Sequence, residues 1–393
     1  MIRGDGKPGV VFSGGSAYAA YEVGVMQALA DGRAASLRNI PTEPYVFSGS
    51  SAGAVNAAWM TSQPGEPLSR VVDDLRSFWL DGVAAGCGTG AIRYRANVTE
   101  FLDPGCFSRE PGAVLRRWID DAAFFFEDWS QRALRFSIGD GTLIRRLIEL
   151  VDMGSIVSVD PLRELLANHL SFEGVRTSPH RLAIAATNWI NGELKTFENR
   201  DMSDEDGVDI IMAASAFPGL PPVYIGGEPY VDGGYVMDTP LLPAIDAGAD
   251  TIHVIYLDPD PANVPIHRLQ STIEVIDRLF VILRATIYHR DIVFAERVND
   301  GLALLEQADS TDLPAPALKG FIRSVAAIKS RLDTGRPYRK IRIHRYHPSD
   351  DLGGVAGLLN FDRDQIEQLI DRGYEDAVTH DCTQSGCVLP AGM

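Results

Sequence analysis

Two short apolar runs near the start of the chain each lead through a glycine turn into a helical pattern. Residues 10–12 precede the turn 13–15 and then apolar residues spaced three and four apart. Residues 45–47 precede the turn 49–53 and then a run of small apolar residues. This spacing predicts helices, and the short apolar runs predict strands. Two successive strand-turn-helix units predict an α/β sheet with its site at the carboxyl ends of the strands.

The rest of the chain continues to alternate between strand-like and helix-like patterns. Residues 251–257 are almost continuously apolar, which predicts a strand buried on both faces. The dipeptide Asn191-Gly192 predicts a two-residue hairpin turn between two further strands. The remaining predicted elements are strands at 181–186, 194–197 and 340–346, and helices at about 270–308 and 362–378.

Composition and charge narrow the class of protein. Apolar residues make up 45% of the chain and charged residues 23%, which is typical of a globular protein. The net charge of −17 opposes binding to phosphate backbones, so no nucleic-acid partner is expected. The chain shows neither a secretory signal nor an uncharged apolar stretch of about 18 residues. We therefore expect a cytoplasmic protein that contacts a membrane, if at all, only peripherally; secretion without such a signal stays open.

The four cysteines are too few and too scattered for a disulfide framework, and none forms a C-x-x-C pair. This usage favours a reducing compartment. Cys382 and Cys387 could form a disulfide in an oxidising one, but two free thiols in a flexible tail are the favoured interpretation. We assign these thiols no role and predict no metal ligands.

The strongest chemical signal is the G-x-S-x-G run that ends the second strand. Gly49 and Gly53 allow the strand and helix to approach closely, and the sharp turn between them projects Ser51 out of the sheet. The following helix directs its amino-terminal amides toward a developing negative charge. This arrangement predicts a nucleophile elbow, although a small-residue turn selected only for packing would give the same pattern.

The turn after the first strand reads Gly14-Gly15-Ser16-Ala17. Glycines here allow backbone amides to face a phosphate or a tetrahedral oxyanion. The third glycine of a dinucleotide fingerprint is missing, and no Walker lysine follows, so nucleotide binding is the weakest interpretation. A plain turn between a strand and a helix is the alternative without function.

A third motif, Asp232-Gly233-Gly234, follows a short apolar strand. Two glycines after the acid allow the backbone to turn abruptly and place the carboxylate on a loop beside the sheet. An ordinary Asp-Gly hairpin turn would also explain this pattern.

Taken in this order, the three motifs resemble the patatin-like phospholipase family. The resemblance spans most of residues 8–378 and implies a three-layer α/β/α fold with a mostly parallel central sheet and helical insertions. The segments that carry it beyond the motifs are 213–219, 240–250 and 361–374. We expect a catalytic domain at 8–260 with an insertion at about 64–175, the rest of the same unit at 261–380, and a flexible tail at 381–393.

The resemblance implies a serine-dependent lipid acyl hydrolase of phospholipase A or lysophospholipase type. Ser51 would be the nucleophile and Asp232 the base, with the oxyanion hole formed at Gly14, Gly15, Ser16 and Ala17. No metal or organic cofactor is implied, and the partner is a lipid or ester substrate. An ordinary Asp titrates about 3 units below neutrality, so the dyad must recover about 4 kcal/mol of proton affinity.

The sequence departs from the family pattern G-G-G-x-[RK]-G, because Ser16, Tyr18 and Ala19 replace a glycine, the cation and a glycine. The missing cation favours a neutral ester over a phospholipid. Asp238 stands where the family usually has asparagine, which we expect to affect only local loop bonding. These departures motivate an alternative, a weakly active or inactive lipid-binding or partner-regulated protein of the same fold.

Three further interpretations concern residues outside the motifs. A Ser-Asp-His triad could recruit His253, His267 or His289, of which His267 has the most suitable position. The aromatic stretch 118–129 could form a lid, although an amphipathic helix packed on the core is favoured. The basic residues of 319–345 could contact an anionic membrane or guard an edge strand. No oligomeric state is predicted.

Overall fold

We analysed a computed structural model of the chain. It describes residues 7–37, 43–84, 90–94, 157–217, 220–258, 272–310 and 339–390, together with part of 112–126. Residues 120, 125 and 127–129 of the proposed lid, His267 and the basic residues from 319 to 338 lie outside the described residues.

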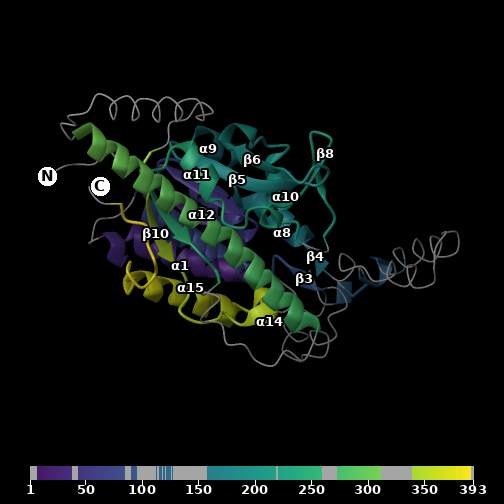
Figure 1. The fold of residues 1–393 in the computed structure, drawn as a ribbon. Helices are drawn as coiled ribbons and strands as arrows, with labels where there is room; N and C mark the ends of the chain where they lie inside the picture. The colour runs from purple at the N-terminus through teal and green to yellow at the C-terminus, as the bar shows by residue number, and fades with distance from the viewer. Residues whose placement is uncertain are drawn as a thin grey trace, which may run out of the picture.

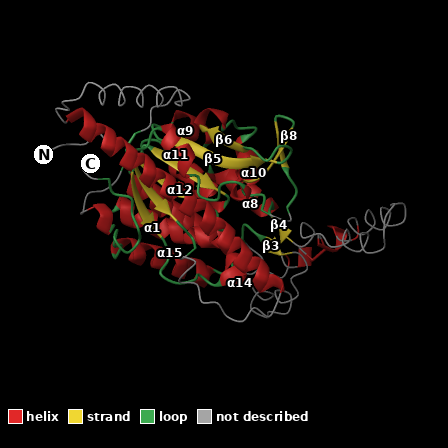
Figure 2. Cartoon of the chain, in the orientation of Figure 1, coloured by secondary structure: helices red, strands yellow, loops and turns green. Residues whose placement is uncertain are grey.

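An eight-stranded mixed sheet forms the centre of the molecule (Figures 1 and 2). Its strand order is β10-β9-β1-β2-β5-β8-β7, and β6 pairs with β5. The strands are β1 (Pro8–Phe12), β2 (Val46–Ser50), β5 (Arg181–Asn188), β6 (Leu194–Glu198), β7 (Val223–Ile225), β8 (Glu228–Asp232), β9 (Thr251–Ile255) and β10 (Arg342–Tyr346). The pairs joining β10, β9, β1, β2 and β5 are parallel, whereas β6, β7 and β8 pair antiparallel.

Helices cover both faces of the sheet, which confirms the predicted three-layer α/β fold. Val10 and Val11 are consecutive in β1, point to opposite faces and are both fully buried. Val10 belongs to the core beneath α1 (Ala19–Ala30), α2 (Ala52–Thr61) and α15 (Arg363–Val378). Val11 belongs to a smaller core beneath α11 (Leu241–Ala247) and α12 (Thr272–Ser310).

Shorter elements connect these layers. The helices are η1 (Ser16–Tyr18), η2 (Ala35–Leu37), α3 (Leu68–Ser77), η3 (Phe78–Val83), α8 (Asp160–His169), α9 (Phe172–Thr177), η5 (Asn199–Asp201), α10 (Gly207–Ala214), η6 (Gly233–Tyr235) and α14 (Gly354–Leu358), and β3 (Arg93–Tyr94) pairs with β4 (Val157–Ser158). The β5–β6 connection is longer than the predicted two-residue hairpin. It spans residues 189–193, because Asn188 and Glu193 close the turn and Gly192 adopts φ 71° within it.

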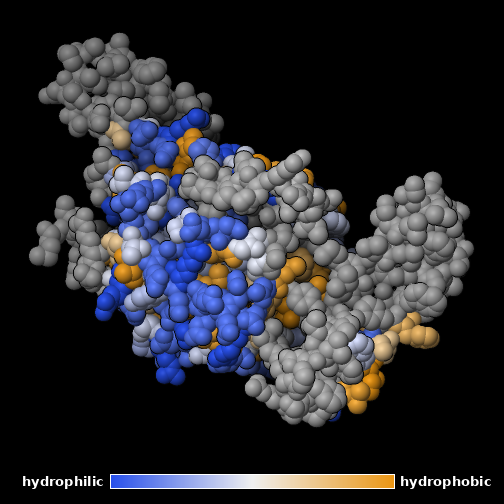
Figure 3. Space-filling model, turned by 90° about the horizontal axis from the view of Figure 1, so that it is seen from below, coloured by the Kyte–Doolittle hydropathy of each residue, from blue (hydrophilic) through white to orange (hydrophobic). Residues whose placement is uncertain are grey.

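The carboxyl-terminal helix α15 contacts α1 backbone to backbone. A Cβ added at Gly24 would lie 1.8 Å from Ile370 O, and one added at Gly373 would lie 2.0 Å from Tyr21 O. The two glycines therefore permit a close crossing. Figure 3 shows the molecule from the side on which α15 lies in Figure 1, and the described surface there is mainly hydrophilic. This pattern fits an amphipathic helix whose buried side chains, such as Ile366 and Leu369, face the core.

Among the described residues, no helix combines the length and the apolar character that a membrane crossing requires.

Candidate active site

Ser51 occupies the sharp turn between β2 and α2 in a strained conformation. Its backbone has φ 52° and ψ −130°, a region that non-glycine residues rarely adopt. Such strain costs about 1–3 kcal/mol and persists only where neighbouring groups enforce it. Here the Ser51 amide donates to Ala214 O at 2.9 Å, and Ser215 Oγ donates to Ser51 O at 3.0 Å. The end of α10 therefore fixes both sides of the serine.

The two glycines flanking Ser51 sit where the backbone leaves no room for a side chain. A Cβ added at Gly49 would lie 2.1 Å from Gly53 O. A Cβ added at Gly53 would lie 2.6 Å from Ser13 O. The strand, the helix and the neighbouring loop thus approach closely, as a nucleophile elbow requires.

The ends of β2 and β8 meet on one edge of β5. β2 ends with Ser50 opposite Ala185. β6 occupies the other edge of β5 at both Ala185 and Ala186. β8 therefore pairs with the same edge of β5 as β2, beyond the point where β2 ends. The last residue of β8, Asp232, pairs with Ala186. Ala185 and Ala186 are consecutive, so strand β2, which leads into Ser51, ends beside Asp232.

Asp232 is 5% exposed and is held by its own turn. Its Oδ1 accepts a hydrogen bond from the Gly234 amide at 2.7 Å, and its backbone carbonyl accepts one from Thr187 Oγ1 at 2.9 Å. A Cβ added at Gly233 would lie 2.4 Å from Ala185 O, so the chain crosses close over β5 immediately after the acid. The Gly234 amide thus holds one oxygen of this buried carboxylate within its own turn.

The glycine loop after β1 lies directly beside Ser51. A Cβ added at Gly14 would lie 3.0 Å from Ser51 Cβ. The Gly14 amide donates to Asp238 O at 3.0 Å. The amides of Gly15, Ser16 and Ala17 donate to no group among the described residues. Within the part of the chain that the structure describes, these three amides are thus available to a ligand of the loop.

Ser16 adopts the conformation that a glycine would take more readily. Its φ of 51° lies in the left-handed region, and Ser16 and Ser51 are the two non-glycine residues with positive φ in the described part of the chain. Strain is therefore concentrated at these two serines, one in each loop.

Tyr18 occupies the position where the family pattern has a cation. It is 4% exposed, and its hydroxyl donates to Gly354 O at 2.6 Å. A Cβ added at Gly357 would lie 2.3 Å from the same hydroxyl oxygen, so α14 packs tightly on the tyrosine. The side chain at this position therefore connects the glycine loop to the carboxyl-terminal part of the chain.

Asp238 brings a second carboxylate to the site, which the sequence analysis treated only as a loop residue. A Cβ added at Gly14 would lie 2.4 Å from Asp238 Oδ1, and one added at Gly234 would lie 2.9 Å from it. The second position would also be 3.1 Å from Asp232 Oδ1. Asp238 Oδ1 therefore lies near Gly14, the glycine beside Ser51, and near Gly234, whose amide binds Asp232.

Glu22 is buried beneath the glycine loop and was not singled out from the sequence. It accepts hydrogen bonds from the Ser13 amide at 2.6 Å and from Asn56 Nδ2 at 2.8 Å. Trp79 Nε1 donates in turn to Asn56 Oδ1 at 2.8 Å. Burial raises the pKa of Glu22 well above its ordinary value of 4.5, in spite of both donors. The available signal was an acid within the otherwise apolar helix that follows the loop.

Two of the three histidines considered for a triad lie in the described part of the chain. His253 is buried in β9, stacks on His344 with ring centroids 5.1 Å apart, and contacts Tyr346 Oη at 3.1 Å. His289 is exposed on α12. The described contacts bring neither to Ser51.

Apolar side chains are exposed beside Asp232. Trp189 is 56% exposed and Ile190 is 76% exposed, both in the turn after β5. Tyr235, three residues after Asp232, is 44% exposed and packs edge-to-face on Trp189, with ring centroids 6.2 Å apart. Burial and the neighbouring charge of Asp232 raise the pKa of Tyr235. These three residues form an apolar rim next to the candidate site.

A cavity also lies at the opposite end of the sheet. Its lining includes Arg181 at the start of β5, Arg200 and Asp246. Because β2 and β5 are parallel, this cavity is separated from Ser51 by the length of the strands. We assign it no part in the candidate site.

A comparison with protein families agrees with this architecture. The family described as patatin-like phospholipase matches residues 10–245. The chain therefore belongs to the patatin-like phospholipase family. No curated protein matches it. Among solved structures it is similar to VipD from Legionella pneumophila, with 14% identity and a TM-score of 0.34, over 94% of this chain and 67% of that protein. Family membership supports hydrolysis of lipid acyl esters as the general activity.

Proposed function

We propose that this protein is a serine-dependent lipid acyl hydrolase that uses Ser51 as nucleophile and Asp232 as base. The observation that supports it most directly is the meeting of β2 and β8 on one edge of β5. This meeting brings a strained serine beside a buried carboxylate, although 181 residues of sequence separate them.

The proposed reaction is an acyl transfer in two steps. Asp232 accepts the proton of Ser51 Oγ while this oxygen attacks the ester carbonyl, and the amides of Gly15, Ser16 and Ala17 stabilise the oxyanion. Collapse of the tetrahedral intermediate expels the alcohol, which takes the proton from Asp232. Water then gives a proton to Asp232 and attacks the acyl-enzyme. Collapse of the second tetrahedral intermediate releases the fatty acid, and Asp232 returns the proton to Ser51 Oγ.

Asp238 bears on the low proton affinity of an aspartate that acts as a base. A second negative charge near Asp232 favours the form in which Asp232 holds a proton, because two like charges in close proximity repel. An ordinary aspartate lacks about 4 kcal/mol of the proton affinity needed at neutral pH. Asp238 and the low exposure of Asp232 both act to reduce this deficit.

The charges at the site favour an uncharged acyl ester over a phospholipid. Tyr18 supplies no positive charge at the position of the family cation, and Asp238 adds a negative one where the family usually has a neutral asparagine. Both changes disfavour a phosphate group near the glycine loop. The apolar rim of Trp189, Ile190 and Tyr235 offers a place for an acyl chain or a lipid surface beside Asp232.

Labelling with a fluorophosphonate probe tests the nucleophile directly. The native chain is expected to label at Ser51 and to hydrolyse monoacylglycerol faster than phosphatidylcholine. Ser51→Ala removes the labelling, and both Ser51→Ala and Asp232→Asn lower hydrolysis by at least about three orders of magnitude. Ser349→Ala and Asp364→Asn, which replace exposed residues, serve as matched controls.

Two results would count against the proposal. Unchanged hydrolysis in Ser51→Ala would remove Ser51 from the mechanism. No labelling and no hydrolysis by the folded native chain, with or without lipid vesicles, would favour the alternative of a lipid-binding protein without turnover.

A further inference from the structure

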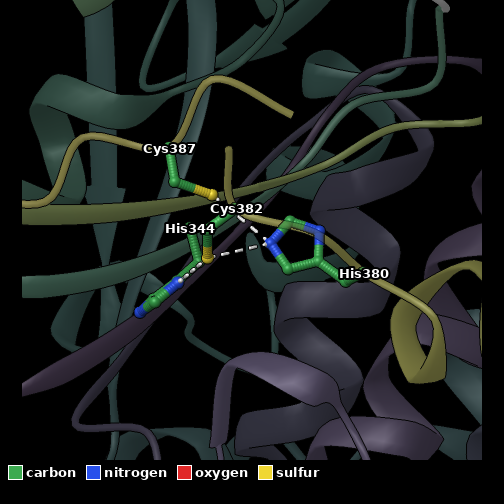
Figure 4. A group of neighbouring side chains, drawn as sticks. All are labelled: His344, His380, Cys382 and Cys387. Carbon is green, nitrogen blue, oxygen red and sulfur yellow. Dashed lines mark hydrogen bonds between the residues drawn. The ribbon is translucent and has the colours of Figure 1, made fainter. Parts of the chain in front are cut away.

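Four side chains with metal-ligating atoms converge at the β10 edge of the sheet, remote from Ser51 in the strand order (Figure 4). His344 lies on β10, and His380 follows the end of α15. Cys382 and Cys387 lie in the turn after it and form no disulfide. One ligating atom from each of the four residues lies within 4.8 Å of all the others.

The distances within this cluster match those of a tetrahedral metal centre. Cys382 Sγ lies 3.4 Å from both His344 Nδ1 and His380 Nε2. Cys387 Sγ lies 3.3 Å from His380 Nε2. Zinc bonds of about 2.3 Å to sulfur and about 2.0 Å to nitrogen place neighbouring ligand atoms of a tetrahedron roughly 3.5 Å apart. These three distances therefore fit an ion of this size, and all four ligating atoms lie within 4.8 Å of one another.

Contacts outside the cluster orient its members as they do around structural metals. Ser385 Oγ lies 3.3 Å from His380 Nδ1, which leaves Nε2 directed at the two sulfurs (Figure 4). The Arg345 amide donates to Cys387 Sγ at 3.3 Å. Hydrogen bonds of this kind fix the ring orientation of a histidine ligand and stabilise a thiolate.

The backbone of the turn is also defined. The Cys387 amide donates to Cys382 O at 2.9 Å, and Ile343 and Val388 form a two-way bridge at 2.9 Å in both directions. The segment predicted from the sequence as the start of a flexible tail is thus attached to β10 on both sides of His344.

We propose that His344, His380, Cys382 and Cys387 form a structural zinc site. Two thiolates and two imidazoles are a donor set that zinc favours, and thiolates disfavour magnesium and calcium. Four protein ligands leave no open position for water or substrate, so the site is structural and takes no part in ester hydrolysis. This inference does not depend on the proposed function.

The charge balance of the binding step is simple. His344 and His380 each offer one imidazole nitrogen, and Cys382 and Cys387 each offer one thiol sulfur. One Zn²⁺ would displace two thiol protons to the solvent and leave a neutral complex, which suits a partly buried position.

The expected role is to clamp the carboxyl-terminal segment to the sheet. His380 follows α15, and α15 crosses α1 at Gly24 and Gly373. An ion bound by His344 and His380 would join the end of α15 to the edge strand. Metal loss should therefore release this helix end and lower the thermal stability of the whole unit.

Metal analysis of the native full-length chain is the first test. Protein purified under reducing conditions is expected to contain about one equivalent of zinc by plasma mass spectrometry. Exchange with Co²⁺ should give the absorption of a tetrahedral ion with thiolate charge-transfer bands. Removal of zinc with a chelator should lower Tm by about 5 °C or more, and added Zn²⁺ should restore it.

Variants locate the ion. Cys387→Ser and His344→Gln are expected to lower zinc content at least about tenfold. Thr383→Ala changes an exposed residue of the same turn and should keep it, as should His169→Gln on α8. Fluorophosphonate labelling of Ser51 in the chelated protein at low temperature should remain, which separates this site from the proposed dyad.

The proposal is overturned if the reduced native chain takes up neither zinc nor cobalt. It is also overturned if zinc remains unchanged in Cys387→Ser, or if Cys382 and Cys387 form a disulfide in the purified protein whose reduction creates no zinc binding.

Discussion

The Ser51 site and the His344 cluster lie on different strands of one sheet and are held by different kinds of contact. Around Ser51, backbone meets backbone, since side chains at Gly49, Gly53 and Gly233 would collide with main-chain atoms. Around His344, side chains meet side chains across a turn that ends in exposed residues. The Ser51 site depends on glycines that allow the main chain to approach closely, whereas the cluster depends on the chemistry of its four side chains.

This difference predicts how each region responds to change. The Ser51 site should tolerate almost no added atom, because the atoms in the way belong to the main chain. The cluster should tolerate changes in its turn as long as its ligating atoms remain. Three predictions, from the largest expected effect to the smallest, examine this contrast.

The largest effect is expected from adding one methyl group at the elbow. Gly49→Ala would place Cβ 2.1 Å from Gly53 O, and the free energy of unfolding should fall by about 3 kcal/mol or more, with loss of probe labelling. Gly386→Ala, in the turn of the cluster, would place Cβ 2.9 Å from the flexible end of Arg345 in a backbone with φ 63°. The free energy of unfolding should therefore fall by only about 1 kcal/mol. Urea unfolding measures both, and equal losses would contradict the contrast.

Glu22 adds a titrating group to the backbone-built site. Because burial raises its pKa in the folded chain, its contribution to stability is complete below about pH 4.5 and is lost as pH rises through the folded value. In Glu22→Gln an amide group faces the Asn56 donor. This change should lower the free energy of unfolding by about 1 kcal/mol near pH 4.5. The gap between native and variant should then close as pH rises.

Urea unfolding at several pH values follows this trend. The exposed Glu164→Gln serves as the control and should show no comparable change with pH. A gap that widens with rising pH would mean that Glu22 is stabilised in its charged form, against the direction given by its burial.

The smallest effect is expected from Asp238→Asn. The substitution is nearly isosteric and removes one negative charge from beside Asp232. Proton transfer from Ser51 to Asp232 should then be less favourable, and kcat/KM at neutral pH should fall by about tenfold or less. An unchanged or higher kcat/KM would show that Asp238 does not act on the base through its charge.

How far the sequence predicted the molecule depended on how its chemistry is encoded. Gly49, Ser51 and Gly53 are contiguous, and a strand pattern on one side with a helix pattern on the other defines their backbone. The layers of the fold followed in the same way from apolar runs buried on both faces. Local patterns were sufficient where one short segment contains the whole feature.

Apart from the pair of Ser51 and Asp232, which the family resemblance implied, features assembled from distant segments were not predicted. His344 lies 36 residues before His380, and the two cysteines have no C-x-x-C spacing, so the sequence does not show that the four side chains lie close together. Asp238 was known as a departure from the family pattern, but its distance to Gly14 depends on a loop 224 residues away. Tyr18 could not be assigned a partner for the same reason.

The contact between Tyr18 and Gly354 has a consequence for the order of synthesis. The glycine loop leaves the ribosome more than 300 residues before its partners α14 and α15. Until then the α1 surface that receives α15 has no cover, and the loop beside Ser51 lacks its outer support. A nascent or prematurely terminated chain would thus contain all three sequence motifs before the site around Ser51 is complete. Such a chain would expose apolar surface and would be bound by chaperones or degraded by proteases.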